Sequence, residues 1–502
     1  MIAKAKVLFV GLDSADPDLV LEWCDSGDLP VLQSLRETGV WGKTTTPLGF
    51  GNGVMWPSLF TGVNPAKHGR YFGRQVKPGS YQAAYFREDT DFKRQPIWAE
   101  LSQAGRRVAV IDMVRAPLTK NLNGIQLADW MTHDSPGPPR SWPLDLISKV
   151  TEKFGDDPFG GVTDEAGRDA AAYTEICRQM VERVETKTAL CCELLDQGPW
   201  DLFMTVYADS HDVGHQCWHI HDSSHPKHDA ALKSKIGDPL KQIYMAMDKD
   251  VGRLISEAGP DARVMVFTGP GMGPGYTASF MLDQILRRLD GEGGEKGRTY
   301  VDTLKSVYRA LLPPAVRNRL HHMAERSEDA MLIADRGRRK CFAVPHNENS
   351  GAIRINLVGR EPKGQVNPGP ECDAFCAALT NDLREIVNLD TGEPIVEEVV
   401  RVAETFKGEH VNDLPDLLVI WSRRDPISAA GSPKIGEIRS SYAGSRTGDH
   451  TPHGLFFASG KGLSPVALPN RVSVMDVGAT ICSWLDVTLE DTDGLPIAEL
   501  CE

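Results

Sequence analysis

Long apolar segments are missing from this sequence of 502 residues. No stretch approaches the roughly 20 apolar residues that a helix needs to span a bilayer. The apolar run at residues 7–10 is too short for the hydrophobic region of a secretion signal, and it leads into Asp13. We therefore expect this run to be a strand and the protein to be cytoplasmic, with no membrane as a partner.

The sequence also lacks a block of basic residues. The formal net charge is -14, and the Lys and Arg residues are spread along the chain. This distribution argues against duplex nucleic acid as the main partner, although it allows a local cationic pocket for an anion. Apolar residues make up 41% and charged residues 25% of the chain, which excludes a disordered or fibrous protein.

The cysteines of this sequence also lack a regular spacing. Among the ten cysteines, only Cys191 and Cys192 are adjacent, and Cys372 and Cys376 are four apart. This spacing gives neither a zinc-knuckle pattern nor a compact disulfide framework. We expect free thiols, which agrees with a reducing compartment.

The sequence does contain a regular alternation of strand-like and helix-like segments. The strand-like runs are at residues 7–10, 107–111, 201–207 and 262–268. The helix-like stretches are at residues 17–36, 97–104 and 240–258. Such alternation is typical of βαβ units, so we predict an α/β fold with a mostly parallel central sheet and helices on both faces. Its ligand sites should lie at the carboxyl ends of the strands.

Two regions interrupt the alternation and divide the chain. We expect residues 1–279 to form the first part of the core and residues 426–502 to complete it. Residues 280–344 include a stretch rich in Gly, Glu and Lys, which predicts an insertion that could cap the site. Residues 345–425 are typical of a smaller α+β unit.

The segment from Asp209 to Asp222 follows a predicted strand and is rich in metal-binding side chains. It holds four histidines and three aspartates within 14 residues. Two neutral imidazoles four residues apart, His211 and His215, can point at one ion from a loop or a helical turn. The alternative is a set of solvated surface histidines, which is our interpretation of His219, His221, His225 and His228.

A second histidine segment precedes an apolar strand near the end of the chain. His450 and His453 lie in a loop bounded by Gly448 and Gly454. Taken alone, a histidine in such a loop is equally a surface residue or a ligand. Arg446 could bind an oxyanion through two hydrogen bonds, and a solvated arginine is the alternative.

Asp13 and Asn52 lie where other predicted strands end. Asp13 follows the first strand, a usual place for a carboxylate that serves a metal or a phosphate, and a turn or helix-capping Asp is the alternative. Asn52 lies between Gly51 and Gly53. These glycines permit a tight turn into a helix whose backbone amides face an anion, and a purely structural turn is the alternative.

Taken in order, these segments resemble the alkaline phosphatase superfamily, in particular its type I phosphodiesterase/nucleotide pyrophosphatase branch. The matching stretches are residues 7–13, 56–69 (WPSLFTGVNPAKHG), 211–218, 264–274, 448–454, 474–480 (VMDVGAT) and 493–496 (DGLP). Their order is that of the family from end to end, which makes the resemblance specific. It implies an alkaline-phosphatase-like fold and cleavage of phosphate or sulfate esters by two metals and a Thr, Ser or modified Cys nucleophile.

Carried over residue by residue, the resemblance implies a first metal site made of three histidines. His211 stands where the family has an Asp, while His215 and His450 match. A neutral imidazole still ligates, but it leaves the ion with one negative charge less around it. We expect one divalent metal ion, with zinc as the first choice and manganese or iron as alternatives.

The second metal site is degenerate. Asp13 matches its first ligand, but Gly269 and Pro270 stand where an Asp-His pair is expected. Asn52 falls on the nucleophile position, and a carboxamide is not a credible nucleophile. We therefore expect a single metal and no covalent intermediate.

Two functions are compatible with these residues. The first is a single-metal hydrolase of a small anionic ester, in which a metal-bound hydroxide attacks, Asp13 or Asp212 acts as base, and Asn52 with its backbone amides stabilises the oxyanion. Arg446 would bind the substrate. The second is a pseudoenzyme that binds a phosphorylated ligand, or a metalloenzyme of another reaction type. The complete set of ligating side chains at the first site favours the hydrolase.

Overall fold

The computed structural model covers the chain with a few gaps. The residues that it describes are 4–133, 137–160, 164–165, 167–291, 334–347 and 349–501. Most of the predicted insertion, residues 292–333, lies outside the described residues.

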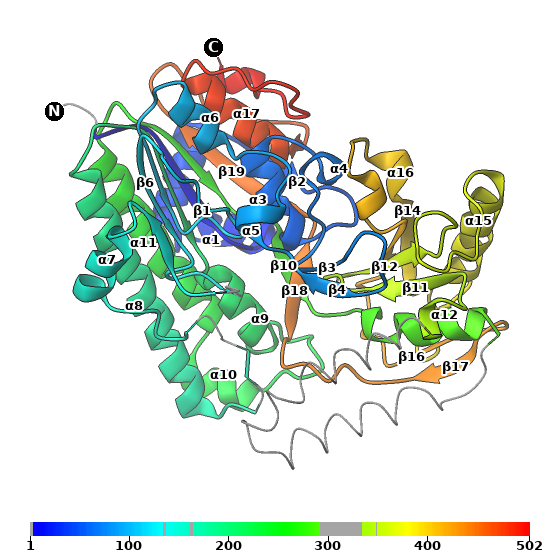
Figure 1. Ribbon diagram of the computed structural model, residues 1–502. Helices are drawn as coiled ribbons and strands as arrows, with labels where there is room; N and C mark the ends of the chain where they lie inside the picture. The colour runs from blue at the N-terminus through cyan, green and yellow to red at the C-terminus, as the bar shows by residue number, and fades with distance from the viewer. Residues whose placement is uncertain are drawn as a thin grey trace, which may run out of the picture.

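A large, mostly parallel sheet forms the body of the molecule (Figure 1). At its centre β1 (Ala5–Leu12) pairs in parallel with β8 (Trp200–Tyr207) and β9 (Arg263–Phe267). The parallel order continues from β8 through β5 (Val108–Ile111) to β6 (Gly124–Ala128). The α/β class and the strands predicted near residues 7, 107, 201 and 262 are confirmed.

Antiparallel strands complete the sheet at its two edges. On the β9 side, β19 (His453–Ser459) runs antiparallel to both β9 and β2 (Val40–Thr45). On the far side, β7 (Arg140–Trp142) pairs antiparallel with β6. The short strands β20 (Val466–Ala467) and β21 (Val472–Ser473) pair with β2.

Both faces of the sheet are covered, because β1 is apolar on both sides. Val7 and Phe9 belong to one buried cluster, while Leu8 and Val10 belong to another, as the alternation of side chains along a strand requires. Such a continuous apolar run is typical of a strand in a parallel sheet with helices on both faces.

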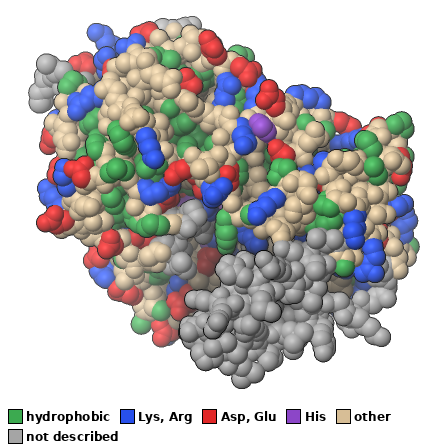
Figure 2. Space-filling view, viewed as in Figure 1, with side chains coloured by type: hydrophobic (Ala, Val, Ile, Leu, Met, Phe, Trp, Pro, Cys, Tyr) green, Lys and Arg blue, Asp and Glu red, His purple; other side chains and the backbone are tan. Residues whose placement is uncertain are grey.

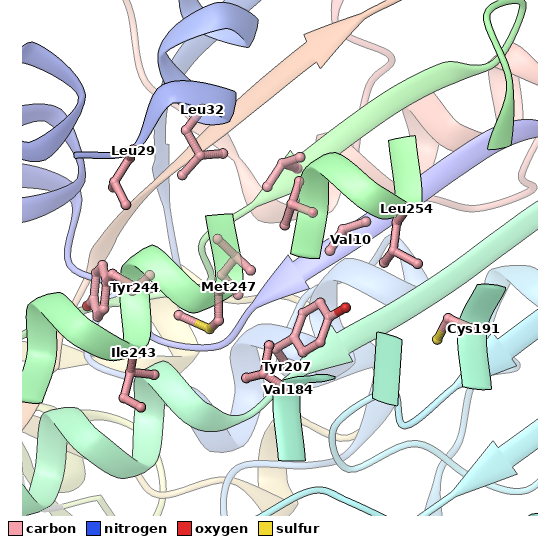
Figure 3. Close-up of a cluster of buried hydrophobic side chains, with 14 of the residues drawn as sticks. Val10, Leu29, Leu32, Val184, Cys191, Tyr207, Ile243, Tyr244, Met247 and Leu254 are labelled. Carbon is pink, nitrogen blue, oxygen red and sulfur yellow. The ribbon is translucent and has the colours of Figure 1, made fainter. Parts of the chain in front are cut away.

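Helices form two layers, one on each face (Figure 1). The helices whose buried residues join the Leu8 cluster are α1 (Pro17–Asp25), α2 (Pro30–Thr38), α8 (Ala170–Leu195) and α11 (Pro239–Ala258). Those that join the Val7 cluster are α3 (Asn52–Thr61), α6 (Ile97–Gln103) and α17 (Val474–Trp484). Figure 3 shows the first layer, with Met247 and Leu254 of α11 beside Val10 of β1 and Tyr207 of β8.

The single helix predicted over residues 17–36 is in fact two helices. The chain leaves α1 through Gly27, whose φ of 79° favours glycine. It enters α2 at Pro30, and proline is favoured at the first position of a helix because its missing N–H is not needed there. The apolar pattern continued across the turn because both helices bury leucines against the same sheet face.

A smaller unit lies beside the body and carries a second, antiparallel sheet (Figure 1). Its strands follow the order β11 (Cys341–Val344), β12 (Ser350–Ile355), β15 (Leu417–Trp421) and β14 (Val396–Arg401). Helices α12 (Leu282–Leu289) and α15 (Pro370–Arg384) pack on it in one apolar cluster.

The smaller unit extends beyond the predicted range of 345–425. Strand β11 already belongs to its sheet, and β16 (Ala429–Ser432) pairs with both β13 (Val387–Asn388) and β17 (Gly436–Arg439). All ten cysteines are free, as predicted. Among the described helices, none has the length and apolarity to cross a membrane.

Buried His68 makes the stability of the fold sensitive to pH. Its Nδ1 accepts from the Arg70 backbone N–H at 3.2 Å, and its Nε2 lies 3.1 Å from the Ser58 hydroxyl. Burial, with the nearby Arg70 charge, lowers the pKa of His68 to about 3. The unfolded chain therefore binds this proton at a higher pH than the folded chain does, so stability is lost as pH falls below about 6.5.

We expect this group to reduce the free energy of unfolding by about 2 kcal/mol between pH 7 and pH 5. Urea unfolding of the metal-free protein at both pH values measures the loss. His68→Gln, which can still donate and accept but does not titrate, is the control and should lose correspondingly less. Equal losses in the two proteins would contradict the assignment.

Candidate metal centre and active site

Three histidines converge at the carboxyl ends of the central strands. His211 and His215 lie four residues apart on α9 (Asp209–His221), so they project from one face of the helix. His450 lies on β18 (Gly448–Thr451), and one nitrogen from each of the three rings lies within 4.8 Å of the others. The structure thus brings together the three predicted ligands, although His450 comes from a strand and not from the predicted loop.

The protonation of these rings fits a metal site. His215 Nδ1 lies 2.7 Å from the Gly448 carbonyl oxygen, so this nitrogen carries the proton and Nε2 keeps its lone pair. Burial lowers the pKa of His211, and it lowers the pKa of His215 and His450 well below the usual value, so all three are neutral. His450 Nδ1 is buried and has no hydrogen-bond partner. Three neutral imidazoles with available lone pairs are a zinc-type donor set.

The other histidines of this region are less exposed than predicted. His219 and His225 are both 8% exposed, so the interpretation of these two as solvated surface residues is wrong. His219 lies on α9 with its Nδ1 3.1 Å from the Thr447 hydroxyl, and His221 Nδ1 lies 2.6 Å from an Asp238 carboxylate oxygen. Neither belongs to a candidate metal cluster among the described residues.

A buried arginine on α8 fixes the first turn of α9. Arg183 Nε donates to Asp209 Oδ1 at 2.8 Å, and Arg183 Nη2 donates to Asp212 Oδ2 at 2.5 Å. The second oxygen of Asp212 lies 3.4 Å from His211 Nδ1. Burial alone would raise the pKa of Asp212, but the Arg183 charge lowers it below its usual value. In this arrangement Asp212 orients His211, whereas a general base would need an oxygen directed at the substrate.

Lys187, one helical turn after Arg183, fixes a second loop of the site. Its ammonium lies 2.9 Å from Asp112 Oδ2 and donates to the Met131 carbonyl oxygen at 2.6 Å. Asp112 in turn accepts from the backbone N–H groups of Trp130 and Met131. These bonds hold the segment after β6 that leads to His133.

His133 is the site residue that the sequence analysis missed. Its Nε2 lies 2.6 Å from Asp13 Oδ2, and its ring stacks on His211 with centroids 3.6 Å apart. Asp13, His133 and His211 form a second group of side chains whose ligand atoms lie within 4.8 Å of one another. The signal was weak, because β6 is short and contains a buried Gln126, so residues 124–128 were not recognised as a strand.

Asp13 is completely buried and accepts several hydrogen bonds. The Trp56 indole N–H donates to Oδ1 at 2.9 Å, and the Asn52 amide donates to Oδ2 at 3.3 Å. Burial would raise the pKa of Asp13, but the contact with His133 lowers it below the usual value. Asp13 therefore lies at the predicted place as a carboxylate. Both of its oxygens are engaged by protein donors.

Asn52 is the first residue of α3 and offers no nucleophile. Its amide donor is turned to Asp13, and its Oδ1 is buried with no hydrogen-bond partner. In this orientation the donors left for an oxyanion are the backbone amides at the start of α3, not the carboxamide itself. Gly269 lies close by, since a Cβ there would be 3.4 Å from Asp13 Oδ1, and its φ of 73° favours glycine.

A cleft of about 1240 Å³ opens beside the site. Both His211 and His450 line it, and so do His346 and Asn347 of the smaller unit. The arginines along its wall are Arg70, Arg74, Arg87, Arg115, Arg140 and Arg446. The acidic side chains that line it are Glu88, Asp89, Asp129, Asp164 and Asp449, and the arginines Arg70, Arg140 and Arg446 pair with members of this set. The cleft therefore carries both signs of charge with a slight excess of arginines, and basic and acidic side chains are also intermixed on the molecular face in Figure 2.

Arg446 lies between the cleft and the histidines, where the sequence analysis expected a substrate-binding residue. Its Nε donates to Asp164 Oδ2 at 2.8 Å, and its Nη1 lies 3.3 Å from His215 Nε2. By contrast, Asp209 pairs with Arg183 and His453 lies outside both histidine clusters, so neither supplements the ligands.

Comparison with known structures identifies the fold. The chain is similar to phosphonoacetate hydrolase from Sinorhizobium meliloti 1021 in complex with phosphonoformate, with 13% identity and a TM-score of 0.53 over 95% of this chain and 94% of that one. It is also similar to murine ectonucleotide pyrophosphatase/phosphodiesterase 5, with 12% identity and a TM-score of 0.50 over 97% of each chain. A comparison with curated protein sequences found no match. The fold is therefore the alkaline-phosphatase-like α/β fold.

The family follows from the sequence itself. The family model of type I phosphodiesterase/nucleotide pyrophosphatase matches residues 7–420. The chain belongs to this family, as the resemblance predicted, and is a hydrolase that acts on phosphoester bonds. The family depends on divalent metals and acts on small anionic phosphoester substrates.

Proposed function

We propose that this chain hydrolyses small phosphate or sulfate esters with one catalytic metal ion at His211, His215 and His450, and without a side-chain nucleophile. The observation that supports it is the contrast between these three neutral, convergent imidazoles and Asn52, which occupies the nucleophile position. Zinc fits the three-imidazole set best, with manganese and iron as alternatives. When bound in such a site, zinc lowers the pKa of a water ligand to about 7 and so supplies a hydroxide nucleophile.

The protein's own residues orient the substrate. The backbone amides at the start of α3 face the cleft beside Asp13 and bind an anionic group, helped by the positive end of the helix dipole. Arg446 provides a charged donor on the other side of the histidines. Asp212 and Arg183 keep His211 in place, so the geometry exists before the substrate arrives.

Arg446→Ala tests the substrate-binding part of this proposal. A hydrogen bond to a charged group contributes about 1.5–3 kcal/mol, so we expect kcat/KM for p-nitrophenyl phosphate mono- and diesters and for p-nitrophenyl sulfate to fall about 10-fold to 100-fold. The bound metal should remain. Arg87→Ala is the matched control, because Arg87 lines the same cleft but is exposed and, within the described part of the chain, forms its ion pair with Asp91.

Steady-state kinetics and metal analysis of the two variants test whether Arg446 binds the substrate. The proposal expects a loss in Arg446→Ala and wild-type kinetics in Arg87→Ala. Unchanged kinetics in Arg446→Ala would contradict a substrate-binding role. A wild-type protein that binds metal and none of these esters would contradict the proposed substrate class.

A further inference from the structure

His450 reaches the metal site from a narrow ribbon of two strands and not from the main sheet. In this ribbon β18 runs antiparallel to β10 (Gly271–Pro274), and the two strands form their own sheet. Strand β10 consists of Gly271, Met272, Gly273 and Pro274, so it has few side chains that could hold its partner strand. Contacts from outside the ribbon must therefore fix the position of His450.

Helix α9 holds the first end of β18. His215 Nδ1 donates to the Gly448 carbonyl oxygen at 2.7 Å, and the Thr447 backbone N–H donates to the His215 carbonyl oxygen at 2.7 Å. These bonds join the strand to the helix that carries the other two predicted metal ligands. They act on residues before His450, so the backbone of His450 itself needs a separate anchor.

Side chains hold both backbone polar groups of His450. Its N–H donates to Asp449 Oδ1 at 2.7 Å, and its carbonyl oxygen accepts from Arg423 Nη1. The other terminal nitrogen of the same guanidinium donates to the Asp449 and Pro274 carbonyl oxygens, both at 2.8 Å. Arg423 thus bridges both strands of the ribbon, and hydrogen bonds from a charged donor are about twice as strong as neutral ones.

Arg423 belongs to the smaller unit and lies two residues after the end of β15. This strand is paired on both of its sides, with β12 and with β14. Its last residue, Trp421, is completely buried, and its indole N–H donates to the Ser279 hydroxyl at 2.7 Å. The guanidinium therefore extends from a well-supported strand and holds the ribbon against the smaller unit.

We propose that Arg423 is a positioning residue, through which the smaller unit holds His450 in the three-histidine site. The inference goes beyond the proposed function and rests on it only in taking His450 as a metal ligand. Removal of the guanidinium leaves three carbonyl oxygens without this donor and frees the backbone at the ligand. Because His211 and His215 lie on α9, this change should loosen one ligand and leave the other two in place.

Cobalt binding tests this role without relying on turnover. Metal-free protein is titrated with Co²⁺, and the visible absorption spectrum reports the dissociation constant and the geometry of the ligands around the ion. In Arg423→Met we expect the dissociation constant to rise about 10-fold to 100-fold, as for other residues that orient a metal ligand, and the spectrum to change. Arg423→Lys keeps the charge and three donors, so it should recover part of the affinity.

Arg424→Met is the matched control. Arg424 is the next residue in the chain and is exposed, so this variant should bind Co²⁺ with the affinity and spectrum of the wild type. Circular dichroism of the metal-free proteins checks that each variant is folded. Arg423→Gln, which also removes the charge but keeps an amide donor, replaces Arg423→Met if the latter does not fold.

His450→Ala distinguishes failure of this inference from failure of the proposed function. If His450→Ala loses Co²⁺ affinity while folded Arg423→Met binds as the wild type does, Arg423 does not position the ligand and the three-histidine site stands. Equal losses in Arg423→Met and Arg424→Met would also overturn the role of Arg423. If the wild type binds no Co²⁺, or if His450→Ala binds it unchanged, both the inference and the proposed metal site fail.

Discussion

His215→Ala should abolish both metal binding at the first site and ester hydrolysis. His215 contributes the nitrogen whose orientation is fixed by the Gly448 carbonyl oxygen, and its loss leaves two imidazoles at the three-histidine site. Loss of a partner that only orients a ligand costs about 10-fold to 100-fold in metal affinity or activity, so removal of the ligand itself should cost more. Metal analysis together with turnover of p-nitrophenyl esters measures both effects.

The matched control is His219→Gln, on the same helix one turn later. His219 is also buried, at 8% exposure against 1% for His215, but it contacts Thr447 and belongs to neither histidine cluster. It should keep the metal and the activity. If His215→Ala retained wild-type turnover at a fixed low metal concentration, the three-histidine site would not be the catalytic one.

Arg183→Met should cause the largest loss of stability. The substitution leaves Asp209 and Asp212 buried, at 0% and 2% exposure, without their counter-charge. Breaking a buried ion pair by removing one partner costs about 3–5 kcal/mol of the free energy of unfolding. Because Asp212 also orients His211, metal affinity in the folded fraction should fall about 10-fold to 100-fold.

Arg178→Met separates the buried network from a general effect on α8. Arg178 lies on the same helix, but its ion pair with Glu175 is 52% exposed on both sides, and exposed pairs contribute about 0–1 kcal/mol. Denaturant unfolding should therefore show a small change for Arg178→Met and a large one for Arg183→Met. Losses of similar size would mean that the Asp209 and Asp212 carboxylates are not held by Arg183 in solution.

Much of the fold was predictable because strands and helices leave local patterns. The apolar run at Val7–Val10 arises because β1 is buried on both of its faces. The 3.6-residue pattern of α11 arises because this helix is buried on one face. The turn between α1 and α2 was not recognised, since both helices continue the same apolar pattern. The limits of the smaller unit also differ from the prediction, because β11 pairs with β12 from before residue 345, and β16 pairs with β13, which is distant in the sequence.

The functional site also contains residues that local sequence patterns predict and residues that only the folded sheet brings together. His211 and His215 share one helix, so their spacing in the sequence indicates that both can bind one metal ion. His133 becomes a partner of Asp13 only when β6 is placed two strands away from β8, and this pairing is a property of the whole sheet. The prediction of a single metal was made without His133, which the sequence did not place beside Asp13.

Two residues with predicted catalytic roles make contacts in the folded chain that do not fit those roles. Asp212 was considered a base from its sequence position, but a buried guanidinium from α8 occupies one oxygen and His211 lies near the other. Asn52 was considered an oxyanion donor, but its amide group is directed to Asp13. Neither contact could be inferred from the sequence, because each joins segments that are distant in the chain.

The three-histidine metal centre is tested most directly by a crystal structure of zinc-loaded protein with diffraction data collected above and below the zinc absorption edge. The account predicts an anomalous peak at ligand distance from His211, His215 and His450, with the Arg183 guanidinium hydrogen-bonded to Asp212. A protein that binds zinc in solution but shows its peak elsewhere, or a fully loaded crystal without a peak among these three rings, would contradict it.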